Sequence, residues 1–229
     1  MTILTKIIYH LKDSKNIINI IFNLRFFRIY TVSIFKFLFI KSMLPNTISF
    51  RIANALDLKA IVKVKIDTWK TTYRGIISEE YLQSLSYDNK EENWRQRLEN
   101  PTHRAIIYVA ETDQNEIVGF VLATIEKCNP IVALLQAERY KGELCAIYVL
   151  EGFQHKKIGT ELVRLVVNYF KVNKVNSMIT WVLKENPSRR FYEKLGGKFL
   201  GEQSVVIGGL RYIEIAYGWE NIEYILLHF

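Results

Sequence analysis

Cysteine, proline and glycine are scarce in this chain, whose 229 residues include two cysteines, four prolines and 11 glycines. Two cysteines cannot build a disulfide scaffold, and such scarcity is typical of proteins in a reducing compartment. So little proline and glycine excludes collagen-like and linker-rich chains. The sequence also contains no internal repeat and no low-complexity linker. Together these absences predict a folded cytoplasmic protein.

Several ligand-binding motifs are missing as well. No G-x-G-x-x-G stretch occurs, so a dinucleotide fold would lack its fingerprint. Gly152 and Gly159 are seven apart and no lysine follows Gly159, which excludes the phosphate-binding loop of ATPases. The histidines show no metal-ligand spacing with each other or with the cysteines, so we expect no metal site. These histidines are His10, His103, His155 and His228.

The excess of positive charge is confined mainly to one end of the chain. The net charge is +8, from 31 Lys+Arg against 23 Asp+Glu. Residues 1–42 contain seven basic side chains and one acid, a net of +6, so residues 43–229 carry only +2. A nucleic-acid-binding domain needs a basic face with interleaved aromatic residues. Residues 43–229 show no such pattern, so we expect no nucleic-acid partner.

Residues 1–42 form a basic, apolar N-terminal extension. Arg25, Arg28 and Lys36 interrupt its apolar run, whereas a membrane-spanning helix needs about 20 apolar residues. No small-residue cleavage site follows, which disfavours a signal peptide. Three interpretations stay open: a basic amphipathic helix in weak contact with a membrane, an extra helix packed on the domain, or a dispensable extension with Met43 as the true start.

Residues 43–229 have the periodicity of a single α+β domain with a mixed sheet. Hydrophobic residues make up 49% of the whole chain and aromatic residues 13%, enough to bury a core. The alternating patterns predict strands over 48–54, 105–111, 117–126, 142–150 and 177–183, and a final hairpin turning at Gly208-Gly209. Helical spacing and capping residues predict helices from Asp57 to Trp69, after Ser78, over 90–98, over 160–170, and after Asn186-Pro187.

The stretch from residue 143 to residue 163 carries the most specific chemistry. A strand leads into a loop bearing Lys156 and Lys157, and a helix then begins near Ile158. Free N–H groups and the helix dipole make such a turn an anion site. From these residues alone, a solvated basic turn before a core helix explains the pattern equally well.

This loop resembles the coenzyme A signature of the GNAT superfamily of N-acetyltransferases, Q/R-x-x-G-x-G/A. Gln154 and Gly159 match its first and last positions, while Lys157 replaces the first glycine. A second stretch is similar to the family's late helix, and its matching residues are Asn186, Ser188, Phe191, Tyr192, Glu193, Gly196 and Gly197. The resemblance covers residues 48–219. It implies a three-layer fold in which helices flank a mixed, mostly antiparallel sheet of about six to seven strands.

The resemblance also implies a reaction, the transfer of an acetyl group from acetyl-coenzyme A to a primary amine in a ternary complex. The amine would belong to a small molecule, a polyamine or an amino terminus. The implied coenzyme contacts are Ile147, Tyr148, Val149, Gln154, His155, Lys156, Lys157, Ile158, Gly159, Thr160 and Asn186. The alternative is a non-catalytic acyl-coenzyme A-binding or regulatory module on the same fold. The sequence leaves a homodimer open.

Acetyl transfer needs a base and an acid. An alkylammonium has a pKa of about 10.4, so a base must help to form the neutral nucleophile. Glu143, at the start of a strand facing the acceptor, is the candidate base, and a solvated strand end is its simpler interpretation. Tyr192 matches the family tyrosine beside the coenzyme sulfur and is the candidate acid for the departing thiolate; it also fits plain packing.

The acceptor side is less clearly defined by the sequence. Trp69, Tyr73 and Glu79 are the candidates, because aromatic rings and an acid suit a cationic amine. The helical spacing of the two aromatic residues also fits core packing. Trp181 is interpreted as a packing residue of a strand. The pair Arg189-Arg190 could contact the 3′-phosphate of the coenzyme, and the simpler interpretation, which we favour, is that both side chains are solvated.

Overall fold

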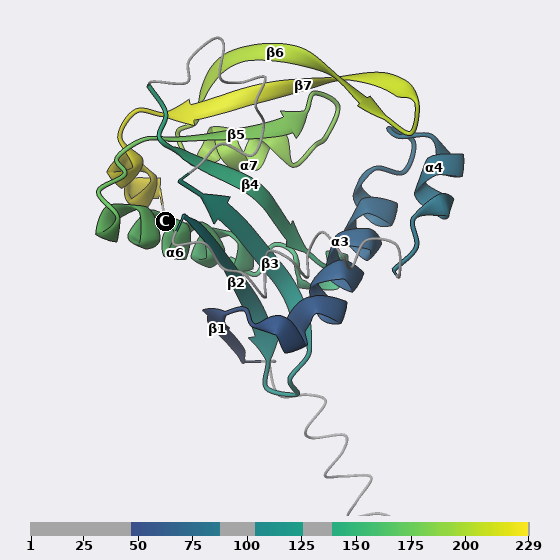
Figure 1. Ribbon diagram of the computed structural model, residues 1–229, viewed down its shortest axis with the longest axis horizontal. Helices are drawn as coiled ribbons and strands as arrows, with labels where there is room; N and C mark the ends of the chain where they lie inside the picture. Colours follow the sequence, from purple (N-terminus) through teal and green to yellow (C-terminus); the bar gives the residue numbers. More distant parts are fainter. Residues whose placement is uncertain (1–46, 88–103, 126–138, 229) are drawn as a thin grey trace, which may run out of the picture. The chain divides into compact units, whose positions relative to one another are not determined.

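The computed structural model describes residues 47–87, 104–125 and 139–228 (Figure 1). The N-terminal extension and the helix expected over 90–98 lie outside these residues. A seven-stranded sheet runs through the domain in the order β1-β2-β3-β4-β5-β7-β6. Its strands are β1 (Ile48–Ile52), β2 (Ala105–Thr112), β3 (Ile117–Thr124), β4 (Gly142–Val149), β5 (Met178–Leu183), β6 (Lys198–Ile207) and β7 (Leu210–Trp219). The helices are α3 (Leu58–Thr72), α4 (Glu79–Ser84), α6 (Ile158–Val172) and α7 (Arg189–Lys194), with 3-10 turns η1 (Ala55–Asp57), η4 (Glu151–Phe153) and η5 (Ile222–His228).

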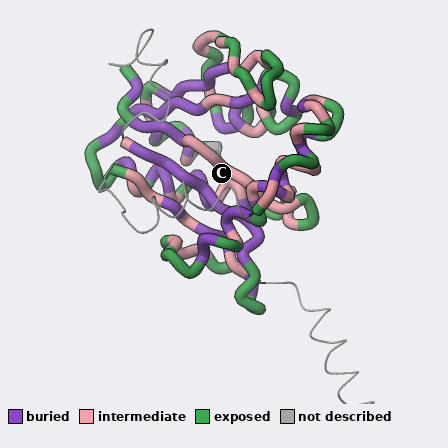
Figure 2. Tube along the Cα trace, turned by 45° about the vertical axis from the view of Figure 1, so that its right-hand side comes forward, coloured by how far each residue is buried: buried purple, intermediate pink, exposed green. Residues whose placement is uncertain are grey.

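Helices cover both faces of the sheet. On one face, Ile61 and Val62 of α3 pack in one core cluster with Phe120 of β3. On the other, Leu162 and Val166 of α6 pack in a second cluster, which also contains residues of α7 and η5. The buried residues follow the central strands, and exposed residues gather at the outer turns (Figure 2). All neighbouring strands are antiparallel except β4 and β5. The prediction of a three-layer α+β fold with a mostly antiparallel sheet is confirmed.

The two parallel strands separate after a short stretch of pairing. The register between β4 and β5 ends at Leu144 opposite Thr180. A bulge at Cys145 bends β4 there, because Leu144 and Ala146 face the consecutive β3 residues Ala123 and Leu122. Beyond this point β4 continues along β3, while β5 continues along β7. The main-chain edges of the two strands therefore face each other across an opening.

Two residues were predicted to cap helices through their side chains, and one of the two predictions is correct. Ser78 caps α4 as expected, since its Oγ accepts a hydrogen bond from the Tyr81 N–H at 3.4 Å. Asp57 makes no side-chain cap on α3, so that prediction was wrong. Instead, the 3-10 turn η1 precedes α3, and the Asp57 carboxylate accepts from the Asn54 N–H at 2.8 Å. The same carboxylate pairs with Arg51 at 2.7 Å, which ties β1 to this turn.

The C-terminal hairpin reverses at Gly208 and Gly209, as predicted. Both residues have positive φ, 58° and 82°, which glycine adopts without strain. A Cβ on Gly208 would lie 2.6 Å from the ring of Tyr81, so the hairpin tip approaches α4 closely. Glycine is therefore needed here for contact as well as for conformation.

Candidate active site

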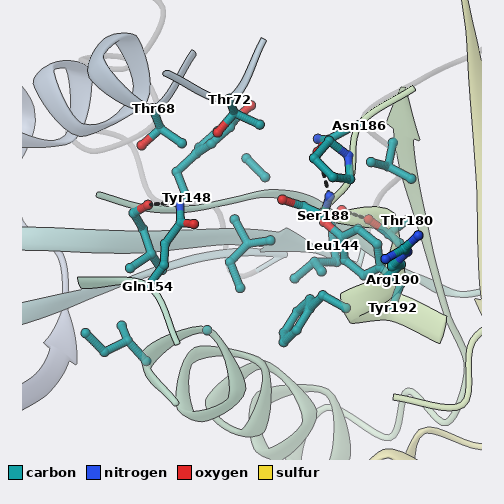
Figure 3. Close-up of a pocket in the computed structure, with 18 of the residues that line it drawn as sticks. Thr68, Thr72, Leu144, Tyr148, Gln154, Thr180, Asn186, Ser188, Arg190 and Tyr192 are labelled. Carbon is teal, nitrogen blue, oxygen red and sulfur yellow. Dashed lines mark hydrogen bonds between the residues drawn. The ribbon is translucent and has the colours of Figure 1, made fainter. Parts of the chain in front are cut away.

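A cleft of about 610 Å³ opens where β4 and β5 separate (Figure 3). At one end lie Thr68 and Thr72 of α3, near Tyr148 and Gln154; at the other end lie Asn186 and Tyr192. Its lining comes from the end of α3, from β4 and β5, from the loop before α6, and from α7 with the turn that leads to it. The cleft thus joins both helical layers to the opening in the sheet.

The first turn of α6 has the free N–H groups that the predicted anion site requires. The leading N–H groups of a helix have no carbonyl partner within it, and here they belong to Ile158, Gly159 and Thr160, all of which line the cleft. Glu161 is the acid of this turn, and its carboxylate is paired with Arg164 at 2.7 Å. Its negative charge is therefore offset, and the turn remains suited to a phosphate.

Lys157 directly precedes α6 and has a left-handed backbone, with φ 62° and ψ 6°. This is the conformation that glycine adopts easily at the corresponding position of the family motif. The lysine therefore keeps the geometry of the turn at the expense of backbone strain, on the order of 1–2 kcal/mol.

Two substitutions at Lys157 should separate its charge from its backbone. Lys157→Gly and Lys157→Ala both remove the ammonium, so both should weaken coenzyme A binding by a few-fold. Only glycine relieves the strain, so the free energy of unfolding of Lys157→Gly should exceed that of Lys157→Ala by about 1 kcal/mol. Urea unfolding and calorimetric titration with coenzyme A measure the two quantities. Equal stability of the two variants would contradict the strained conformation.

Most of the predicted coenzyme contacts line the cleft. They are Ile147, Tyr148, Val149, Gln154, His155, Lys157, Ile158, Gly159, Thr160 and Asn186. Lys156 does not, because its ammonium lies over the ring of Phe153, 4.9 Å from the centroid. Gln154 Nε2 donates to the Val149 carbonyl at 3.0 Å, which fastens the loop to the end of β4. Arg190, expected to be merely solvated, adds an exposed cation to the lining.

Asn186 is buried, with 5% of its surface exposed, and its amide connects two walls of the cleft. Oδ1 accepts from the Ser188 N–H at 2.8 Å, and Nδ2 donates to the Tyr73 hydroxyl at 3.3 Å. An amide nitrogen carries two hydrogens, so one donor remains for a ligand.

Tyr192 lies where the two strands separate, with only 8% of its surface exposed. The Tyr192 phenol lies close to Thr180, whose hydroxyl donates to the Leu144 carbonyl at 2.9 Å. Burial, and secondarily the nearby Tyr148, raises the pKa of the Tyr192 phenol. The phenol is therefore protonated at physiological pH and is available as a donor.

Two further phenols lie close to Tyr192. Burial raises the pKa of Tyr73 and of Tyr148, and the Tyr148 hydroxyl accepts from Trp69 Nε1 at 3.0 Å. Trp69 also packs edge-on against Tyr73, with ring centroids 5.0 Å apart. Trp69 is not part of the cleft lining, whereas Tyr73 and Tyr148 are. Trp69 thus orients the Tyr148 hydroxyl from outside the cleft lining.

Comparison with known proteins agrees with this geometry. Residues 67–197 match the model of the acetyltransferase (GNAT) family. The chain belongs to the GNAT family. This GNAT protein is 33% identical over 175 residues to the uncharacterized N-acetyltransferase YuaI of Bacillus subtilis, a match covering 76% of this chain and 94% of that protein. It is 26% identical over 155 residues to a spermidine N(1)-acetyltransferase of Thermoplasma acidophilum, covering 66% and 89%.

A solved structure shares the fold. The crystal structure of the PaiA N-acetyltransferase from Thermoplasma acidophilum in complex with coenzyme A superposes with a TM-score of 0.55 at 23% identity. The match covers 73% of this GNAT chain and 98% of that chain. The family and fold that the two sequence motifs implied are therefore confirmed.

Two predicted carboxylates lie outside the lining of the cleft. Glu143 is 4% exposed at the start of β4, between Thr124 of β3 and Ile179 of β5, and the lining begins one residue later at Leu144. Glu79 is exposed in the first turn of α4, where it accepts from Gln83 at 3.1 Å. The structure brings neither acid into contact with the cleft.

Two polar groups that the sequence gave no reason to single out do line the cleft. Thr68 Oγ1 and Trp181 Nε1 are buried and have no hydrogen-bond partner among the described residues. Thr68 is only 5% exposed. An unsatisfied buried polar group costs about 1–3 kcal/mol, so such groups are typical of a site completed by a ligand. A threonine on a helix and a tryptophan on a strand give no signal of this in the sequence.

Two other kinds of site are not found in the part of the chain that the structure describes. It contains no group of three or more His, Cys, Asp or Glu side chains placed to hold a metal ion. None of its helices is both long and apolar enough to cross a bilayer.

Proposed function

We propose that the protein transfers the acetyl group of acetyl-coenzyme A to a primary amine of a small cationic molecule, with polyamines as the leading class. One observation carries the proposal: a single cleft joins the anion-binding first turn of α6 to the buried, protonated phenol of Tyr192. Membership of the GNAT family supports the reaction, and the relative named as a spermidine acetyltransferase supports the acceptor class.

The residues present fit acetyl-coenzyme A. The N–H groups of Gly159 and Thr160, with the ammonium of Lys157, would hold the pyrophosphate. The separated main-chain edge of β4 and the remaining amide hydrogen of Asn186 would bind the pantetheine arm. Bound acetyl-coenzyme A supplies the activated thioester.

The protein would then stabilise charge and move protons. An N–H of residues 145–149 in β4 would donate to the tetrahedral oxyanion. Tyr192 would donate its proton to the departing sulfur. Glu143 remains our predicted base, and because the cleft lining begins one residue later, at Leu144, it would act through a water molecule.

The test is thiol release from acetyl-coenzyme A by the full-length protein with polyamines, aminoglycosides, amino acids and peptides. We expect release with a polyamine and, by mass spectrometry, a product heavier by one acetyl group. Coenzyme A binding in calorimetry without turnover on any amine would replace this function with the non-catalytic binding module. A cytoplasmic location, a homodimer and membrane contact by residues 1–42 stay predictions.

A further inference from the structure

A half-buried carboxylate, that of Glu214 in β7, lies on the sheet face covered by α3 and α4. The register places Glu214 opposite Leu183 at the end of β5, and Leu183 packs in the same core cluster as Tyr73. The Asn186 N–H donates to the Leu183 carbonyl at 2.9 Å, and its side chain donates to the Tyr73 hydroxyl. Glu214 is not part of the cleft lining itself, and it lies toward the same sheet face as Tyr73.

No cation neutralises Glu214 among the described residues. Its carboxylate accepts from the neutral amide of Gln203 at 2.6 Å, and the nearby Lys184 is paired with Glu202 at 2.8 Å. Burial raises the pKa of Glu214, and its charge contributes to the raised pKa of Tyr73, so the two groups lie within electrostatic range. A carboxylate partly removed from water, with only a neutral partner, is stabilised by an incoming cation.

The sheet face that carries Glu214 is also rich in aromatic rings. Trp69 packs against both Tyr73 and Tyr81, with ring centroids 5.0 and 6.4 Å apart. The Tyr212 hydroxyl accepts from the Ser78 N–H, which joins β7 to the start of α4. In Figure 1 the tip of the β6–β7 hairpin lies beside α4, in agreement with the contact between Gly208 and Tyr81. Of these rings, Tyr73 lies within electrostatic range of Glu214. An aromatic ring near a carboxylate attracts an ammonium through both its charge and its alkyl surface.

Tyr192 and Glu214 lie toward opposite faces of the sheet, and the opening between β4 and β5 joins these faces. Thr180, close to Tyr192, and Leu183, opposite Glu214, are three residues apart on β5, and an odd separation turns their side chains to opposite faces. Three residues span roughly 10 Å along a strand. A ligand that reaches both groups therefore passes through the opening, and a short alkyl chain between two nitrogens has the required length.

We propose that Glu214 binds the second, non-reacting ammonium of a diamine or polyamine, whose other amine is presented at Tyr192. The inference rests on the proposed function and narrows its acceptor class, because Glu214 would favour an acceptor with two ammonium groups over one with a single amine. Glu214 escaped sequence reasoning because β7 follows the predicted acceptor residues by more than a hundred positions.

The experiment compares putrescine with butylamine, which has the same carbon chain and a single amine. Thiol release gives kcat/KM for both amines with the wild-type protein, Glu214→Gln and Glu202→Gln. Gln at position 214 keeps the shape and the acceptor for Gln203 but removes the charge. Glu202, also in the hairpin, faces Ile215 in the register and is the matched control.

We expect the wild-type protein and Glu202→Gln to prefer putrescine by on the order of 10- to 100-fold. Glu214→Gln should lose this preference through a higher KM, with butylamine turnover unchanged. Should Glu214→Gln fail to fold, Glu214→Asp keeps the charge on a shorter side chain and should shift the preference toward cadaverine, one methylene longer.

The remaining outcomes overturn the inference. Acetylation of both amines at equal rates by the wild-type protein would refute the role of Glu214 while the proposed function stands. A preference that survives in Glu214→Gln, or an unshifted preference in Glu214→Asp, would also refute it. Coenzyme A binding with turnover of neither these two amines nor spermidine would count against the proposed function and this inference together.

Discussion

Tyr192→Phe should lower kcat for a primary amine by about 10²- to 10⁴-fold, the usual contribution of a general acid. The KM for acetyl-coenzyme A should change by no more than a few-fold, because the phenol acts on the departing sulfur and the ring remains. The substitution removes a buried hydroxyl close to Thr180, so a change of no more than about 1 kcal/mol in the free energy of unfolding is expected. Steady-state thiol release and urea unfolding measure these quantities.

Tyr217→Phe is the matched control. Its ring stacks on Tyr192 with centroids 6.1 Å apart, but its hydroxyl donates to Glu193 and lies outside the cleft lining. This variant should keep kcat. A fall of less than about tenfold in Tyr192→Phe would mean that another group donates the proton, with Tyr73 and Tyr148 the next phenols to test.

Gly159→Asp should abolish coenzyme A binding, raising Kd by at least about 100-fold, while the fold stays intact. A Cβ at this position lies 3.5 Å from Phe191 and 3.9 Å from Ile147, an ordinary contact distance, so the side chain is accommodated. An acid in the first turn of a helix is favourable to the helix by about 0.3–1 kcal/mol. The same carboxylate repels a pyrophosphate and competes for the N–H groups that would bind it.

Gly159→Ala separates charge from bulk. It adds the same Cβ without the carboxylate and should weaken coenzyme A binding by far less than the aspartate variant. Calorimetric titration with coenzyme A and thermal unfolding, carried out on both variants, give the comparison. Unchanged affinity in Gly159→Asp would show that the pyrophosphate does not bind at the first turn of α6.

Stability and affinity should thus move independently at this turn. For Gly159→Asp we expect retained or slightly raised stability with lost binding, and for Lys157→Gly raised stability relative to Lys157→Ala with similar binding. The patterns differ because glycine relieves the left-handed backbone at position 157, whereas a carboxylate at position 159, inside the helix, favours the helix and repels the pyrophosphate.

The elements of the fold were predictable where the signals are local. Alternation of apolar residues located the described strands, the Gly208-Gly209 pair located the hairpin, and Ser78 located the start of α4. The start of α3 was less accurate, because Asp57 has a stronger partner in Arg51 of β1 than in the helix it precedes. A capping rule considers only neighbouring residues in the sequence, so it does not include a partner such as Arg51, which the fold brings close to Asp57.

The candidate site was predictable only in part. The loop before α6 and the late helix carry recognisable motifs, so the coenzyme side of the cleft could be assigned residue by residue. The acceptor side has no motif, and two of its predicted residues, Trp69 and Glu79, do not line the cleft. Helical spacing of aromatic residues indicates a buried face without saying which residue of that face reaches a cavity.

By itself, the sequence determined the family, the order of the elements and the position of the loop before α6, because each depends on residues close together in the chain. Only the tertiary structure decided where β4 leaves β5, which phenols meet in the cleft, that Glu79 is exposed, and that Glu214 lies within electrostatic range of Tyr73. These features depend on strand register and on helix packing across the sheet, which join residues far apart in sequence. The physical reason is that burial, and with it the pKa of a phenol or a carboxylate, is a property of the assembled core.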